Sequence, residues 1–474
     1  MNVHRRRSLF YERRRSNIYR MFAWALIILA GIWITLGVKT GRVMPLFQPT
    51  PTATRTAQSY ALEGDAFFTA GKLEASILAY QDAVKIDPSN AGIYTKLARI
   101  QTYSSSLLTT DTERKQRLAE ALQSIDQAVA LAPDDSNAHA IRSFVLDWSA
   151  GAATTDADKQ SLLLEADREA TRARQLDNQN VLAQAFYAEI LVDEQKWIQA
   201  EQFILGALER GPDVMDVHRV YAYVLESTLR YRQAIEEYQK AIEINPNLTF
   251  LYISVGVNYR ALAFKSDITS QRNQLYEQAL ENFARAANLN KQLEINDPVP
   301  YIAIAKTYSQ KGDFFAAALN IKQALEFDPA NAGIYGQMGV IYFKARNFES
   351  AIPVLKCSVR GCTPDESCQA RYDSACDPAQ GQTGISVTGL ELSPNSVVYY
   401  YTYGSALAAF GPRYPEYCTE AVSVLDQVRI AYGADPTISS IVGDGLAVCA
   451  GVAQRQSRTP TPYPTSTPLP TPRP

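Results

Sequence analysis

Histidine is nearly absent from this sequence, with only His4, His139 and His218 in 474 residues. Because histidine is the side chain that most readily exchanges protons near neutral pH, little general acid–base chemistry can be built here. The Walker A, HExxH, GxSxG and GxGxxG patterns are missing as well. These absences predict that the chain is not an enzyme and that it holds no cofactor and no metal.

The net charge is small, but the charged residues are unevenly distributed along the chain. The formal net charge is −3, yet residues 1–43 hold nine basic residues and one acidic residue, and residues 454–474 hold three arginines and no acid. The body between these ends is therefore acidic. Since an acidic surface repels phosphate backbones, we expect no nucleic-acid partner.

The longest uncharged apolar stretch runs from Met21 to Val38. As a helix it measures about 27 Å, close to the ~30 Å hydrocarbon core of a bilayer. Seven arginines precede it, and only Lys39 and Arg42 follow closely. This bias predicts a basic cytoplasmic segment at residues 1–20 and a single-pass membrane anchor at 21–38. The rest of the chain would then be extracellular or periplasmic. A cleaved signal peptide is the alternative, but no A-x-A-like site follows.

Two segments are rich in proline and threonine: residues 39–56 and residues 454–474. Proline favours extended polyproline II and cannot donate a backbone hydrogen bond, so we expect a stiff linker after the anchor and an unfolded tail. Such tails also suit contact with a wall or surface polymer, which gives the alternative reading of the chain as a structural envelope component.

Nearly the same line recurs three times along the body, as YQDAVKIDPSNAGIY, EYQKAIEINPNLTFLY and NIKQALEFDPANAGIY. In the first unit, Tyr60, Gly64 and Phe67 share one face of a helix at i, i+4 and i+7. A second helix with the same spacing follows the Gly-containing turn, and Pro88 ends it. Each unit is thus expected to be two amphipathic helices joined by a tight turn.

This unit resembles the tetratricopeptide repeat, a helix-turn-helix of about 34 residues. The resemblance covers residues 57–361, as eight repeats, and recurs in 394–430. Residues 394–453 are therefore expected to hold a last repeat and a capping helix. It implies an all-α, right-handed superhelical solenoid of about nine repeats. The second, third and sixth units are longer, with extra residues between their two helices, and these insertions are expected to lengthen the helices or the loop.

All six cysteines lie in the last quarter of the chain. Their spacing lacks the paired ligands of a zinc site, so disulfides are expected. Residues 416–430 and 437–453 read as antiparallel helices, which would pair Cys418 with Cys449. Cys357, Cys362, Cys368 and Cys376 would pair among themselves, with three connectivities open. They flank or lie in a Cys-rich insert, 362–393, that lacks a helical period, and its ISVTGLEL stretch predicts a short strand or hairpin.

The resemblance also implies a function. In tetratricopeptide repeat proteins the first helices line a concave groove that takes peptides or protein segments. Positions two, five, nine and twelve of each first helix face that groove. The candidate partner-binding residues are Lys96, Arg99, Arg219, Tyr223, Glu226, Arg260, Lys306 and Tyr401.

This set predicts a basic stretch that would suit an acidic or polar partner segment with aromatic anchors. We therefore expect a membrane-tethered interaction scaffold with protein or peptide partners. An enzyme hidden in the Cys-rich insert is the third reading. His139 and His218 occupy the aromatic position of a first helix and are expected to serve packing.

Overall fold

The computed structural model describes residues 17–40, 42 and 55–457. Most of the predicted basic segment, linker and tail therefore falls outside the described residues. The chain divides into two compact units, Met1–Arg55 and Thr56–Pro474.

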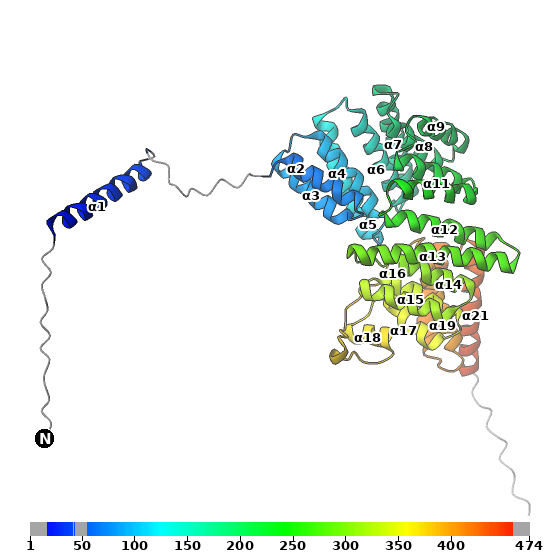
Figure 1. The fold of residues 1–474 in the computed structure, drawn as a ribbon. Coiled ribbons are helices and arrows are strands. Elements are labelled where there is room, and N and C mark those ends of the chain that lie inside the picture. Colours follow the sequence, from blue (N-terminus) through cyan, green and yellow to red (C-terminus); the bar gives the residue numbers. More distant parts are fainter. Residues whose placement is uncertain (1–16, 41, 43–54, 458–474) are drawn as a thin grey trace, which may run out of the picture. The chain divides into compact units, whose positions relative to one another are not determined.

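In the first unit the described residues form one long helix, α1 (Ile18–Lys39), of 22 residues (Figure 1). Its side chains are almost all exposed, although its mean hydropathy is 2.2. Burying such a helix in lipid would satisfy both its apolar surface and its internally bonded backbone. The helix is long and apolar enough to cross a membrane, as predicted, and a signal sequence would pass the same test.

The second unit is a stack of helical hairpins (Figure 1). Nine hairpins are formed by α2 (Ala57–Thr69) with α3 (Leu73–Ile86), α4 (Ala91–Ser105) with α5 (Asp111–Leu131), α6 (Ser136–Gly151) with α7 (Asp156–Leu176), α8 (Val181–Asp193) with α9 (Trp197–Arg210), α10 (Met215–Ser227) with α11 (Tyr231–Ile244), α12 (Thr249–Lys265) with α13 (Thr269–Leu293), α14 (Val299–Lys311) with α15 (Phe314–Phe327), α16 (Ala332–Lys344) with α17 (Phe348–Val359), and α19 (Val397–Phe410) with α20 (Tyr417–Tyr432). The predicted all-helical solenoid is confirmed.

The repeating glycines set how closely the two helices of a hairpin approach. A Cβ atom added to Gly64 would lie 2.8 Å from the ring of Tyr80, and one added to Gly256 would lie 2.4 Å from Phe283. Gly339 and Gly404 meet Leu355 and Leu425 in the same way. The small residue of the first helix therefore receives a large side chain of the second, which is why the pattern recurs.

The aromatic position before each glycine or alanine has a further use. Nε2 of His218 lies 2.8 Å from the carbonyl oxygen of Pro212, and the hydroxyl of Tyr252 donates to the carbonyl of Pro246 at 3.0 Å. His139 makes the same contact with Pro133. Both histidines thus occupy packing positions, as the sequence predicts.

The insertions in the long repeats lengthen their second helices. Helices α5 and α7 each have 21 residues and α13 has 25, against 14 for α3. Each long helix continues the packed face of its hairpin, so the extra turns add helix rather than a long loop.

The array also contacts itself across distant repeats, which the sequence did not predict. The side-chain amide of Asn247 donates to the carbonyl of Thr69, 178 residues away, at 3.1 Å. Gly71, in the same turn, packs against the Asn247 backbone. Further along, Thr109 bonds Asp328 and Asn331. These contacts close the superhelix of the second unit on itself.

The Cys-rich insert differs from its prediction in two ways. It contains a helix, α18 (Pro364–Tyr372), that begins with a capping box between Thr363 and Glu366. The expected strand is wrong: in this segment the structure has an isolated bridge, Cys362 to Val387. A strand needs a partner along its length, and the rest of the insert is a helix and irregular backbone.

Three disulfides crosslink the last quarter of the chain: Cys357–Cys362, Cys368–Cys376 and Cys418–Cys449. The last is the pair that the helical hairpin predicts. It fastens α21 (Pro436–Ser457) to the last repeat, where Val442 and Val452 are buried. By length and composition α21 also passes as a membrane span, at a mean hydropathy of 1.4. Its packing against α19 and α20 agrees with the predicted capping role.

Closure of the superhelix should be measurable through Gly71. Its φ is +79°, and an added Cβ would lie 2.0 Å from the Asn247 carbonyl oxygen, whereas Gly312 has φ +88° and open space around it. We expect Gly312→Ala to cost about 1 kcal/mol of unfolding free energy from left-handed strain alone. Gly71→Ala should cost about 1 to 3 kcal/mol more, because the loop must also move. Chemical unfolding of the full chain, followed by circular dichroism, measures both, and equal losses would contradict the closure.

Candidate functional site

The inner face of the first six repeats is filled by their own side chains. Tyr103, on α4, is fully buried and stacks on Phe250 of α12 with ring centroids 5.2 Å apart. Its hydroxyl bonds Asp216 of α10, and Arg99 of α4 pairs with the same carboxylate. Burial alone would raise the pKa of Asp216, but Arg99 and Arg219 hold it below its usual value. The carboxylate is therefore charged and fully paired.

A second buried pair lies beside the first. Arg219 of α10 donates to both carboxylate oxygens of Glu189 on α8, at 2.8 and 2.5 Å. The indole nitrogen of Trp148 donates to the same carboxylate at 3.1 Å. The guanidinium also lies over the rings of Tyr103 and Phe144, at 5.5 and 5.3 Å from their centroids. This arrangement satisfies a charge that would otherwise be costly to bury.

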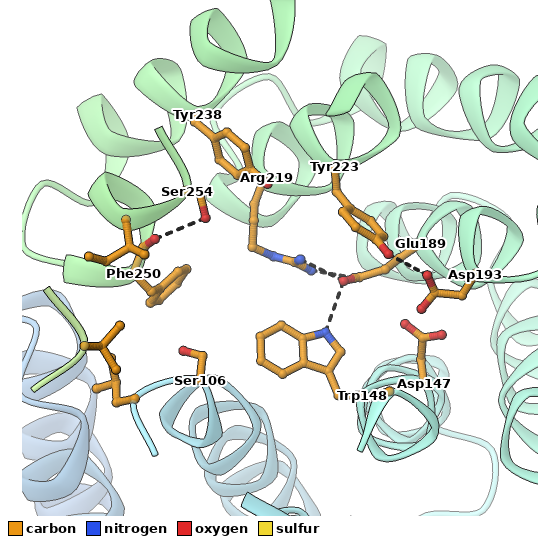
Figure 2. Close-up of a pocket in the computed structure, with 14 residues that line it drawn as sticks. Ser106, Asp147, Trp148, Glu189, Asp193, Arg219, Tyr223, Tyr238, Phe250 and Ser254 are labelled. Atoms are coloured by element: carbon orange, nitrogen blue, oxygen red, sulfur yellow. Dashed lines mark hydrogen bonds and ion pairs between the residues drawn. The ribbon is translucent and has the colours of Figure 1, made fainter. Parts of the chain in front are cut away.

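Next to this pair is a cavity of about 370 Å³ (Figure 2). It is lined by Ser106, Leu107, Asp147, Trp148, Gly151, Glu189, Asp193, Arg219, Tyr223, Tyr238, Phe250, Ile253, Ser254 and Val299. These residues come mainly from α6, α8, α10 and α12, the first helices of consecutive repeats. Its size is that of a small-ligand or side-chain pocket.

The acidic wall of the cavity is formed by Asp147 and Asp193. The hydroxyl of Tyr223 donates to Asp193 at 2.5 Å. Burial, together with Asp193 and Glu189, raises the pKa of Asp147 well above its ordinary value, and burial also raises the pKa of Asp193. Figure 2 shows the two carboxyl groups facing each other.

The structure brings two of the predicted partner-binding residues to the cavity, Arg219 and Tyr223. Arg99 belongs to the adjacent ion pair and does not line the cavity. Glu226 lies close by and accepts hydrogen bonds from Tyr238 at 3.2 Å and Asn258 at 2.8 Å. Burial raises the pKa of Glu226.

The other four predicted residues lie elsewhere. Lys96 pairs with Asp65 on the surface at 2.8 Å. Arg260 donates to the carbonyl of Ala303, and burial lowers its pKa to about 10. Burial, with Arg260 and Lys344 nearby, also lowers the pKa of Lys306. Burial raises the pKa of Tyr401, which lies far along the chain in the last repeat.

The expected basic character of the inner face is not what the structure has around the cavity. Four carboxyl groups, those of Asp147, Glu189, Asp193 and Asp216, meet two guanidinium groups there. The facing-position rule did point to three of them, since Asp216, Glu189 and Asp147 stand at positions two, nine and twelve of their helices. The predicted set included one acid, Glu226, but none of these three.

Comparison with known proteins places the fold. A TPR repeat family model matches residues 64–101, and a tetratricopeptide repeat model matches 220–248 and 300–331. No curated protein matches the chain.

Solved structures with a similar fold include a human IFIT1 dimer with PPP-AAAA, at 16% identity and a TM-score of 0.51, covering 85% of this chain and 92% of that one. The human IFIT1 dimer with m7Gppp-AAAA scores alike, at 16% identity and 0.51, with 85% and 91% covered. A thermophilic TPR protein from Thermus thermophilus is 18% identical, with 43% and 98% covered and a TM-score of 0.36.

The buried Arg219–Glu189 pair should dominate the stability of the inner face. We expect Arg219→Met to cost about 3 to 5 kcal/mol of unfolding free energy, because Glu189 stays buried without its partner. The double change with Glu189→Met should recover most of that loss. Chemical unfolding of the full chain measures each variant.

The surface pair of Arg285 with Glu281, at 2.7 Å, supplies the control. Arg285→Met should cost less than about 1 kcal/mol, because water screens an exposed pair. If the Arg219 and Arg285 variants lost equal stability, the inner pair would have no special role.

Proposed function

Because the chain is a tetratricopeptide repeat protein, we propose that it is a membrane-tethered interaction scaffold that binds a protein or peptide segment on its inner helical face. The single observation that carries this proposal is the cavity between α6, α8, α10 and α12. Aromatic walls next to charged groups that point into a cavity are the composition of a recognition pocket. Since the residues around it are already packed against one another, a partner would insert a side chain there rather than fill a wide groove.

The cavity argues against a phosphate-bearing ligand. The human IFIT1 structures hold PPP-AAAA and m7Gppp-AAAA, both of which carry several phosphates. Here the lining has Asp147, Glu189 and Asp193 against one arginine, and that arginine is already paired. Carboxyl groups at this density would repel phosphates, so the proposal keeps a protein partner and no nucleic acid.

The proposed tether is α1, with the repeat body on the non-cytoplasmic side. Two features support this side: the arginines that precede the helix, and the three disulfides of the body, which persist outside reducing compartments. We expect protease added to cells stripped of any outer membrane and wall to digest the repeats and spare the N-terminal segment. The test is an immunoblot with tags at both ends, and protection of the repeats would overturn the orientation.

Segment binding can be tested by blocking the cavity. Gly151 lines it at the end of α6, is exposed, and has no atom within 4 Å of an added Cβ, so Gly151→Trp should fold and occupy the opening. We expect peptides selected from a random library on the full chain in lipid nanodiscs to bind this variant at least about tenfold more weakly, because their anchor is excluded.

Gly443→Trp is the matched control. Gly443 is also exposed, helical and open around its Cβ, but it lies on α21 and not at the cavity. Peptides should bind this variant as they bind the unchanged protein. A library that yields no binder, or peptides that bind both variants equally, would leave the inner face without its proposed role. Binding to isolated wall polymer instead would favour a structural envelope component.

A further inference from the structure

The cavity is lined by more acidic than basic side chains, and one of the acidic side chains, Asp147, has an oxygen atom that accepts no hydrogen bond from the part of the chain that the structure describes. Asp147 is only 2% exposed, and its Oδ1 atom has no hydrogen-bond partner among the described residues. A buried polar atom left without a partner destabilises the folded state. A ligand that donates a hydrogen bond to this oxygen would remove that destabilisation.

The charged and polar groups around Asp147 determine which kind of ligand could bind to it. Asp193 and Glu189 approach from α8, and Arg219 and Tyr223 approach from α10. The charge of Lys159, on α7, acts to lower the pKa of Asp193. Arg219 is held by both oxygens of Glu189, and its charge lowers the pKa of Asp147 less than burial and the neighbouring carboxylates raise it. Burial and the neighbouring carboxylates raise the pKa of Asp147, which favours one proton shared by the two aspartates in the free protein.

The walls indicate which kind of cation fits. Trp148, Tyr223, Tyr238 and Phe250 line the cavity with ring surface and ring edges. Among the described residues, no group of three or more acidic, histidine or cysteine side chains could hold a metal ion. Aromatic walls next to carboxylates instead favour an organic cation, whose methylene groups contact the rings while its charged end reaches the acids.

We propose that the cavity binds the ammonium or guanidinium end of a lysine or arginine side chain, held between Asp147 and Asp193. The inference that this side chain belongs to a partner's segment rests on the proposed function. The preference of the cavity for a cation does not depend on it. The sequence predicted an acidic or polar partner segment. Because the cavity wall is acidic, the proposed side chain is basic instead.

Binding should release a proton. The cation needs both aspartates ionised, so the shared proton leaves to solvent as the cation enters. At low pH the proton competes with the ligand, and affinity should rise with pH until the shared proton is lost in the free protein too.

The test uses two capped amino acids with matched apolar chains: N-acetyl-lysine-N-methylamide and N-acetyl-norleucine-N-methylamide. Isothermal titration calorimetry on the full chain in nanodiscs should show the lysine probe at least about tenfold tighter, since only the lysine ammonium can donate charge-assisted hydrogen bonds to the carboxylates. Titration in buffers of different ionisation enthalpy should show the proton released.

Asp147→Asn is the decisive variant. Its amide can donate to Asp193 and removes a buried acid, so the protein should be no less stable, and this is checked by thermal unfolding. It should lose the preference for lysine over norleucine and the pH dependence together. Asp444→Asn, at an exposed position of α21, should change neither.

Three results would overturn the inference: equal affinity for the two probes, an unchanged preference in Asp147→Asn, or tighter binding of free 1,5-diaminopentane than of the lysine probe. The last would mean a free diamine site instead of a side-chain site. Cation binding without any selected peptide would overturn the scaffold and leave this site standing, so the two failures can be told apart.

Discussion

The ion pair between Arg219 and Glu189 organises the inner face of this protein. Arg219 projects from α10, pairs with α8, and covers aromatic rings from α4 and α6, so one side chain touches the first helices of four consecutive repeats. A guanidinium in such a place is tolerable only when every donor has an acceptor. The neighbouring Arg99–Asp216 pair completes the set, and the aromatic cluster packs around both.

This internal packing changes how the concave face can work. In an open array of repeats, a groove along the first helices offers a long strip of contact to a partner. Here Tyr103 and its neighbours fill the strip, and what is left is a defined cavity with an acidic wall. Recognition would then depend on one inserted side chain and its immediate surroundings, which is how hot spots concentrate binding energy.

The repeats, their number and the helical class could be predicted because each hairpin contacts mainly its neighbours, and local packing leaves a periodic trace such as Gly64 with Tyr80. The Cys418–Cys449 pairing followed from the same local geometry. Charge pairing could not be predicted, because Arg99 and Asp216 are 117 residues apart and meet only when the array curls. In the insert, Thr363 and Glu366 form a capping box that is typical of a helix start. Helix α18 was not predicted, because its nine residues are too few for a clear helical period.

The contact between the Gly71 turn and Asn247 constrains the history of the chain as well as its stability. Repeat arrays commonly change length by duplicating or losing a unit, since each unit meets only its neighbours. In this array four further hairpins separate the first turn from the loop it contacts, and the meeting of Thr109 with Asn331 imposes a second such spacing. Adding or removing one unit between these points would misalign both junctions at once. The count of repeats is therefore constrained by this geometry, and changes in length are better tolerated where neither junction lies, such as the turn between α12 and α13.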